Sequence, residues 1–274
     1  MKNMLKLTLL AGLVSLSFSA QAKLNLDSPA AKLVTKLTYN QVTITNEFKA
    51  ANGWQGFVVQ TKKQNSQAIL FVDPANKYLF AGALIAADGT NLTQQYTDEY
   101  INKAIAKNAG QAIAKTHWIS EGSDSAPHKI YVLIDPNCIY CHMSFQSLAP
   151  FIAGNQLQVR WVSVGIIKST SLGKAAHLLS IQSPKDQIAA LKQDENDFNS
   201  SQEEGGITAL DESDPAYKMA FNQVVENNTF FTQNQFIGTP VIIYTKADGT
   251  PSIYAGLAQG KDLEAIVNAA GSSW

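Results

Sequence analysis

The chain has 274 residues, 45% of them hydrophobic, with 21 lysine and arginine residues against 22 aspartate and glutamate residues. This near-neutral balance argues against a nucleic-acid-binding protein, which needs a basic face, and the length suffices for two domains. The chain has only two cysteines, too few for a disulfide scaffold of this size.

The N-terminus has the pattern of a secretory signal peptide. A basic start at Met1–Lys6 precedes a short apolar run, Leu7–Phe18, and the small-residue motif Ala20-Gln21-Ala22. We expect cleavage after Ala22. The apolar run is too short for a membrane anchor, and no later stretch resembles a membrane span. We therefore predict an exported, soluble protein without membrane insertion.

Residues 23–90 read as a small α+β domain. Ser28-Pro29 predicts a helix start, and strand-like runs follow at 41–45, 54–60, 68–72 and 78–85, separated by turn signals. So small a domain buries little apolar area and would gain from pairing with a second copy. The run 78–84 is a candidate edge for that pairing, and ordinary sheet core is its alternative reading.

Residues 91–126 read as a linker helix and hinge. An alanine-rich apolar stripe runs through 92–119, as in a helix that connects parts more than it builds a core. The polar segment 121–127 contains glycine, proline and two serines, which predicts a domain boundary.

The second domain opens with the apolar run Ile130–Ile134, which predicts a strand buried on both faces. Asp135-Pro136-Asn137 breaks the strand, and a helical pattern starts at Cys138, with Cys141 one turn later. Unpaired N–H groups and the helix dipole stabilise an anion at Cys138. We therefore predict that Cys138 is the nucleophile of a redox site and Cys141 the resolving thiol.

Three other readings of these cysteines remain open. A disulfide that closes so small a loop would stabilise the fold little. A zinc site would need more ligands than the scattered His117, His128 and His177 offer. The string from Cys138 to His142 also matches the haem c attachment motif, although a buried strand runs directly into it. We expect neither metal nor cofactor.

The remainder alternates sheet and helix. A strand is expected at 158–167, helices at 171–181 and over much of 185–236, strands at 241–244 and 252–254, and a last helix at 261–270. The acidic piece 194–214 has no lysine or arginine; we favour a solvated face, with steering of cationic substrates as the alternative. Gly238-Thr239-Pro240 precedes the first of the last two strands.

Together, the strand, the Cys138–Cys141 helix interrupted at Pro150, and Thr239-Pro240 before two strands and a last helix resemble the thioredoxin fold. With the exported N-terminal domain, the linker helix and a helical insertion at about 169–236, the chain resembles the periplasmic DsbC/DsbG group of thiol:disulfide interchange proteins. Four features resemble DsbG more than DsbC: His117-Trp118, Asp135-Pro136, Pro150 and the run 164–168.

This resemblance implies an α/β thioredoxin-like catalytic domain at 127–274 and a location in the periplasm. It implies a cis peptide at Thr239–Pro240 that faces the cysteines and pairs with a substrate strand. It also implies a homodimer formed through residues 23–90, and a membrane thiol reductase of the DsbD type as a partner. Ile139-Tyr140 departs from the family, which usually has glycine or proline after the first cysteine.

The expected function is reduction or reshuffling of incorrect disulfides in misfolded or oxidised exported proteins. Three alternatives stay open: reduction of sulfenylated single cysteines, net oxidation, and a holdase chaperone that needs no cysteine. For His142, a place on the helix surface is favoured over a role in tuning Cys141.

Overall fold

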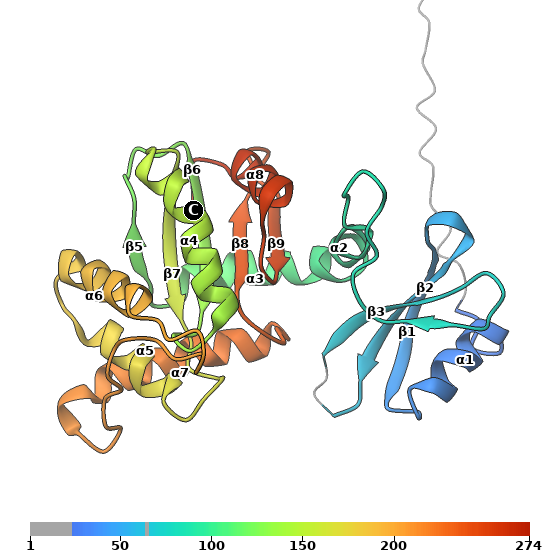
Figure 1. Cartoon of the computed structure of the whole chain (residues 1–274), viewed down its shortest axis with the longest axis horizontal. Helices are drawn as coiled ribbons and strands as arrows, with labels where there is room; N and C mark the ends of the chain where they lie inside the picture. Colours follow the sequence, from blue (N-terminus) through green and yellow to red (C-terminus); the bar gives the residue numbers. More distant parts are fainter. Residues whose placement is uncertain (1–23, 64–65) are drawn as a thin grey trace, which may run out of the picture.

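The computed structural model describes residues 24–63 and 66–274, so the expected signal peptide at 1–22 lies outside the described residues. The chain forms two sheets, each with its own helices, connected through helices α2 and α3 (Figure 1). Within the described ranges, no helix is both long and apolar enough to cross a membrane.

The N-terminal sheet is antiparallel, with the strand order β1-β2-β3-β4. Its elements are α1 (Pro29–Leu37), β1 (Val42–Lys49), β2 (Gln55–Thr61), β3 (Gln67–Val72) and β4 (Leu79–Phe80). Helix α1 begins where predicted, because the Ser28 side chain accepts a hydrogen bond from the Ala31 N–H at 3.1 Å and Pro29 follows it. Its buried face packs on this sheet through residues such as Val34.

The strand expected at 78–85 is wrong for most of its length. Only Leu79–Phe80 pair with β3, and Gly82 has a φ of +151°, which takes the chain out of the sheet. Tyr78 and Ile85 are 70% and 53% exposed. The segment is therefore an exposed apolar border of the sheet and not a full fourth strand.

The connecting region is one broken helix. It consists of α2 (Leu92–Thr97), a π-helical turn (Asp98–Asn102), α3 (Lys103–Ala112) and a final 3₁₀ turn (Ile113–Lys115). Contrary to expectation, α3 also builds core: Ala106 and Ala109 are buried with Ile253 and Ile243 of the second sheet. The π-helical turn breaks the regular α-helical pattern, which sequence periodicity did not indicate.

The second sheet has the order β5-β7-β6-β8-β9. Its strands are β5 (Ile119–Glu121), β6 (His128–Ile134), β7 (Leu157–Ser163), β8 (Val241–Thr245) and β9 (Pro251–Ala255). Strands β6 and β7 are parallel, and all other pairs are antiparallel. The short strand β5 was not predicted.

Both faces of β6 are covered, as its apolar run predicts. Ile130, Val132 and Ile134 point into one core cluster with residues of α4 (Ile139–Ala153) and α8 (Gly260–Ala269). Tyr131 and Leu133 point into the other cluster, with α3. The order strand, cysteine helix, parallel strand, two antiparallel strands and last helix matches the expected thioredoxin-like α/β fold.

Pro150 does not end the cysteine helix, which continues to Ala153. Between β7 and β8 the chain inserts three helices: α5 (Ser171–Ser180), α6 (Pro184–Asn196) and α7 (Lys218–Gln233). The segment between α6 and α7 is mostly irregular. Helix α6 lies on the side of the second sheet away from the N-terminal sheet, and α7 runs beneath the second sheet towards β8 (Figure 1).

Candidate active site

Cys138 lies at the start of α4, as the sequence predicts. Its backbone is extended, with φ −99° and ψ 111°, and its sulfur accepts a hydrogen bond from the backbone N–H of Cys141 at 3.1 Å. Both cysteines are free thiols in this structure. The sulfur of Cys138 therefore occupies the N-cap position, where a helix offers unpaired N–H groups to a negative charge.

The pKa values of the two cysteines are shifted in opposite directions. A hydrogen bond from the Cys141 thiol is the main influence that lowers the pKa of Cys138, to about 7. Burial raises the pKa of Cys141 well above its ordinary value, and the neighbouring Cys138 adds to that rise. Cys138 therefore loses its proton far more readily than Cys141.

A cis peptide bond joins Thr239 and Pro240 opposite Cys138. The sulfur of Cys138 lies 3.4 Å from the carbonyl oxygen of Thr239, which accepts its S–H when the thiol is protonated. The Thr239 hydroxyl is buried, and its hydrogen bonding helps to lower the pKa of both cysteines. The Thr239–Pro240 segment contacts the sulfur through a backbone atom. Gly238, which precedes this segment, is exposed.

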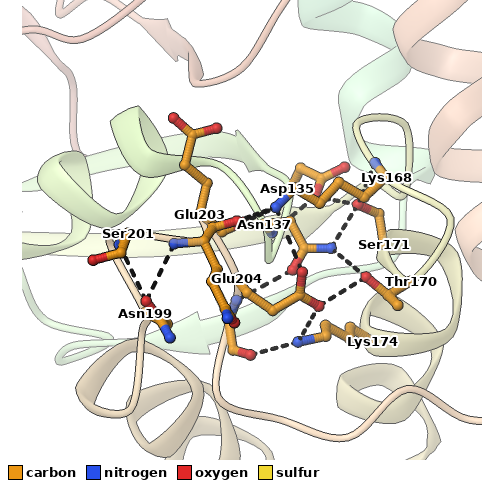
Figure 2. Close-up of polar contacts among 12 residues, drawn as sticks. Asp135, Asn137, Lys168, Thr170, Ser171, Lys174, Asn199, Ser201, Glu203 and Glu204 are labelled. Carbon is orange, nitrogen blue, oxygen red and sulfur yellow. Dashed lines mark hydrogen bonds and ion pairs between the residues drawn. The ribbon is translucent and has the colours of Figure 1, made fainter.

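Asp135 anchors the loop that leads into the cysteine helix (Figure 2). Only 1% of its surface is exposed, and its two oxygens accept four hydrogen bonds of 2.7 to 3.0 Å. The donors are the backbone N–H groups of Asn137, Ile166 and Ile167 and the hydroxyl of Ser171. Burial raises the pKa of Asp135, and these hydrogen bonds oppose the rise.

Asn137, directly before the nucleophile, is fully buried. Its side-chain amide donates to the hydroxyls of Thr170 and Ser171 at 2.9 and 3.0 Å, and its oxygen accepts from the Gly205 N–H at 3.1 Å. The residue thus ties the cysteine loop to two parts of the insertion, the start of α5 and the segment between α6 and α7.

An ion pair lies next to this loop, as Figure 2 shows. The Lys174 ammonium lies 2.9 Å from a Glu204 oxygen and also donates to the carbonyl of Gly205. The same Glu204 oxygen accepts from the Thr170 hydroxyl at 2.8 Å. A side chain built on Gly205 would lie 2.5 Å from both the Pro136 carbonyl oxygen and an Asp194 oxygen. Only glycine fits this contact between the insertion and the cysteine loop.

The solvated face favoured for the acidic piece 194–214 is wrong at its beginning. Asp194 is fully buried and Glu195 is 5% exposed. Burial raises the pKa of Asp194 to about 6 and that of Glu195 to about 8. The expected surface place of His142 is also wrong, because its ring nitrogen Nδ1 lies 2.8 Å from a Glu195 oxygen and only 14% of its side chain is exposed. Sequence reasoning missed these acids because the chain around them is polar.

Access to Cys138 is narrow, since only 4% of the residue is exposed. Exposed apolar side chains come from the segments that adjoin it: Tyr140 in the cysteine helix is 57% exposed, and Ile237 before the cis peptide is 70% exposed. A cavity of about 270 Å³ opens beside Thr239, and its lining includes Ile101, Ile105, Phe236 and Val241. The surroundings suit an apolar, unfolded polypeptide better than a small polar molecule.

The four predicted site residues, Cys138, Cys141, Thr239 and Pro240, therefore meet at one place. No group of three or more histidine, cysteine or acidic side chains among the described residues could hold a metal ion. His117 pairs with Glu226 and His177 bonds to the Thr208 carbonyl, both away from the cysteines.

Comparison with known proteins finds thiol:disulfide interchange proteins of similar sequence. No protein-family model matches the chain. It is 26% identical over 224 residues to the thiol:disulfide interchange protein DsbG of Pseudomonas aeruginosa, covering 82% of this chain and 83% of the relative. It is 28% identical over 179 residues to DsbG of Escherichia coli, covering 65% and 68% of the two chains. The resemblance to the DsbC/DsbG group is thereby confirmed.

Solved structures that resemble the chain include the catalytic domain of Proteus mirabilis ScsC, with a TM-score of 0.45 and 18% identity over 61% of this chain and 96% of that one. Pseudomonas aeruginosa DsbA2 has a TM-score of 0.44 and 14% identity over 55% and 92%.

Proposed function

We propose that this chain, a thiol:disulfide interchange protein of the DsbC/DsbG type, reduces or reshuffles incorrect disulfides in exported proteins through Cys138 and Cys141. One observation carries the assignment of the two cysteines: a sulfur at a helix N-terminus with a pKa of about 7, backed by a buried thiol that donates to it. The thiolate is the form that attacks disulfides.

The proposed reaction begins when the Cys138 thiolate attacks one sulfur of a substrate disulfide. A new bond joins Cys138 to that sulfur, the substrate's S–S bond breaks, and the second substrate sulfur leaves as a thiolate. Attack by Cys141, after loss of its proton, forms the Cys138–Cys141 disulfide and releases a reduced substrate. Attack by another substrate thiol instead returns Cys138 as thiolate and leaves a rearranged substrate, which is isomerisation.

Thr239 and Pro240 are the proposed substrate-binding residues. The carbonyl oxygen of Thr239 lies 3.4 Å from the Cys138 sulfur, and the exposed backbone of Gly238, which precedes Thr239, would pair with an extended substrate strand. Apolar substrate side chains would rest on Ile237 and Tyr140, which are both exposed. This combination selects unfolded chains, whose backbone and apolar side chains are both available.

Residues 23–90 are proposed as a dimerisation domain, residues 91–126 as a linker, and residues 127–274 as the catalytic domain with its insertion at about 169–236. Strand β1 ends the N-terminal sheet on one side, and the border with exposed Tyr78 and Ile85 ends it on the other. Such borders offer backbone groups and apolar surface to a second copy. We further propose that the protein works in the periplasm, where a membrane reductase of the DsbD type keeps the cysteines reduced.

Replacement of each cysteine by alanine tests the function. With Cys138→Ala, reshuffling of a scrambled multi-disulfide protein should fall to the uncatalysed rate; with Cys141→Ala, mixed disulfides should accumulate on non-reducing gels. Reshuffling that survives Cys138→Ala would disprove the proposal. Faster turnover of a sulfenylated one-cysteine protein than of the scrambled one would identify a sulfenic acid reductase.

The apolar surroundings of the site favour a holdase chaperone as the second candidate. Unfolded chains could bind Tyr140, Ile237 and the cavity beside Thr239 without any exchange of disulfides. Suppression of aggregation by a variant that lacks both cysteines, combined with no measurable exchange by the wild type, would make this the main activity.

A further inference from the structure

The cavity beside Thr239 lies between three segments that are far apart in the sequence. Ile101 and Ile105 line it from the linker, Thr239 lines it from the cis-peptide segment, and Gly256 lines it from the end of β9. The carbonyl oxygen of Thr239 lies 3.4 Å from the Cys138 sulfur. The cavity therefore adjoins the redox site, and the linker forms one of its walls.

The walls of this cavity are held in place by contacts elsewhere in the protein. Ile101 is buried in one cluster with Phe48 and Phe71 of the N-terminal sheet. The backbone N–H of Gly256 donates to the carbonyl oxygen of Pro240 at 2.8 Å, which ties the end of β9 to the cis peptide. Because each wall is held by its own neighbours, the cavity is formed before any occupant enters it.

The chemistry of the lining favours an apolar occupant. None of the described residues that line the cavity carries a charge, so a charged side chain would lose its hydration there without gaining a partner. A larger hollow of about 470 Å³ also borders the linker, but charged residues such as Asp98 and Lys246 line it, and it does not reach Thr239. Of these two hollows, the uncharged one adjoins the nucleophile.

The volume of the cavity suits one large side chain. An apolar cavity of about 150 Å³ is enough to bind benzene, so one of about 270 Å³ admits the side chain of leucine, methionine or phenylalanine. A serine or alanine side chain would leave most of it unfilled. Since the gain in free energy follows the apolar area removed from water, a large apolar side chain gains most.

The exchange reaction brings a polypeptide to this cavity. A disulfide between Cys138 and a substrate cysteine holds their Cα atoms about 4.4–6.8 Å apart, so the substrate backbone passes close to Thr239. In an extended chain, alternate side chains point to the same face, and residues two positions apart are separated by about 7 Å. The side chain two positions from the substrate cysteine therefore points towards the protein, over residues 236–238, which line the cavity.

We infer that the cavity beside Thr239 is a specificity subsite, which takes a large apolar side chain two residues away from the cysteine that Cys138 attacks. Ile101 and Ile105 are specificity-determining residues of this subsite. The inference rests on the proposed function, since it needs a substrate chain bound at Cys138. It gives the linker a part in the choice of substrate, besides its connection of the two sheets.

This preference directs the enzyme to misfolded substrates. In a correctly folded protein, large apolar side chains are mostly buried in the core, where a cavity of another protein cannot take them up. In a misfolded chain, the same side chains are exposed. A cysteine two residues from such a side chain is therefore attacked faster when its protein is misfolded.

The test measures the attack of the reduced wild-type protein on short serine-rich peptides, each with one cysteine in a mixed disulfide with thionitrobenzoate. The Cys138 thiolate bonds to the peptide sulfur, the S–S bond to thionitrobenzoate breaks, and the dye leaves as a coloured thiolate, because the thiol of lower pKa leaves faster. One leucine is placed in turn at each position up to three residues before and after the cysteine. With leucine two residues from the cysteine on one side, we expect a rate about fivefold to tenfold higher than with serine, and a change of less than about twofold at the other positions.

Variants that fill the cavity test whether this preference arises there. Thr97→Phe fills it from the linker, and Ala255→Phe fills it independently from β9. In both variants the preference for leucine should fall below about twofold. Thr229→Phe on α7 is the matched control, because the hydroxyl of Thr229 donates to the carbonyl four residues earlier, as that of Thr97 does. This control should keep the wild-type preference.

Equal rates for all leucine positions in the wild type would overturn the inference, and so would a full preference for leucine in both filled variants. In either case the proteins still exchange with the serine peptide, so the proposed function would stand. Absence of exchange with every peptide, the serine peptide included, would contradict the proposed function and the inference with it.

Discussion

The two sides of Cys138 are built in opposite ways. On one side, the Gly238–Pro240 segment approaches the sulfur with a single carbonyl contact, and the adjoining Ile237 is 70% exposed. On the other side, Asp135, Asn137 and the insertion form a buried, hydrogen-bonded frame. The difference separates two tasks: the open side can admit a partner strand, while the frame keeps the cysteine loop in place without a partner.

The largest effect on stability should come from removing the Asp135 carboxylate from the frame. Asp135→Ala leaves three backbone N–H groups and the Ser171 hydroxyl without their acceptor, which should cost about 3–5 kcal/mol of unfolding free energy. Urea denaturation measures this loss. Asp27→Ala, on an aspartate whose side chain is 95% exposed, should leave the midpoint unchanged. A similar midpoint for both variants would show that the frame does not hold the loop.

The Gly205→Ala variant tests the contact between the insertion and the loop that leads into the cysteine helix. Its methyl group would lie 2.5 Å from the Pro136 carbonyl oxygen, so the loop must shift, at a cost of about 2–3 kcal/mol. Gly249→Ala has open space around its added carbon but a positive φ of 83°, so it controls for backbone strain alone. We expect Gly205→Ala, and not Gly249→Ala, to slow alkylation of Cys138 as well.

The buried acids of the frame should make stability depend on pH. The folded pKa of Asp194 is raised to about 6 from an ordinary 3.8, so the folded state binds this proton more tightly than the unfolded state. The stabilisation that Asp194 gains from this proton is complete below pH 3.8, and it is lost as pH rises through 6.

In Asp194→Asn this pH-dependent loss of stability should disappear. Between pH 4 and 7 the free energy of unfolding should therefore fall by about 1–2 kcal/mol less in the variant than in the wild type. Thermal or urea unfolding at several pH values measures it. Parallel curves for variant and wild type would mean that Asp194 is not desolvated in the folded protein.

The smallest effect on the protein should come from a substitution on the open side of Cys138. Ile237→Ser removes an exposed apolar side chain and should leave stability unchanged, because the residue packs on little. Binding of an unfolded, cysteine-containing peptide should weaken about twofold to fivefold. Met219→Ser, equally exposed at 66% but on α7, is the matched control. Equal binding by both variants would remove Ile237 from the proposed substrate surface.

The sequence predicted the open side better than the frame. The buried strand ending at Ile134 and the helix starting at Cys138 follow from local pattern, and Thr239-Pro240 follows from a resemblance. The frame depends on contacts between residues far apart in the chain, such as Asn137 with Gly205 and His142 with Glu195. In the sequence, Asp194 and Glu195 look like part of a polar surface, since only the folded insertion shows that they are buried.

Local reasoning failed for a similar cause in the N-terminal sheet and the linker. The apolar run after Tyr78 has strand-like composition, but Gly82 leaves the sheet. The stripe through Ala106 and Ala109 looked too narrow for core, yet it packs on β8 and β9. Small residues allow such close packing, which periodicity alone does not show.

The most direct test of the account is the acidity of the two thiols. Alkylation of the reduced protein by iodoacetamide, followed against pH and mapped by mass spectrometry, reports each cysteine separately. We expect Cys138 to react with a midpoint near pH 7 while Cys141 stays unmodified. A midpoint for Cys138 at or above the free-cysteine value of about 8.5, or earlier reaction of Cys141, would contradict the central claim.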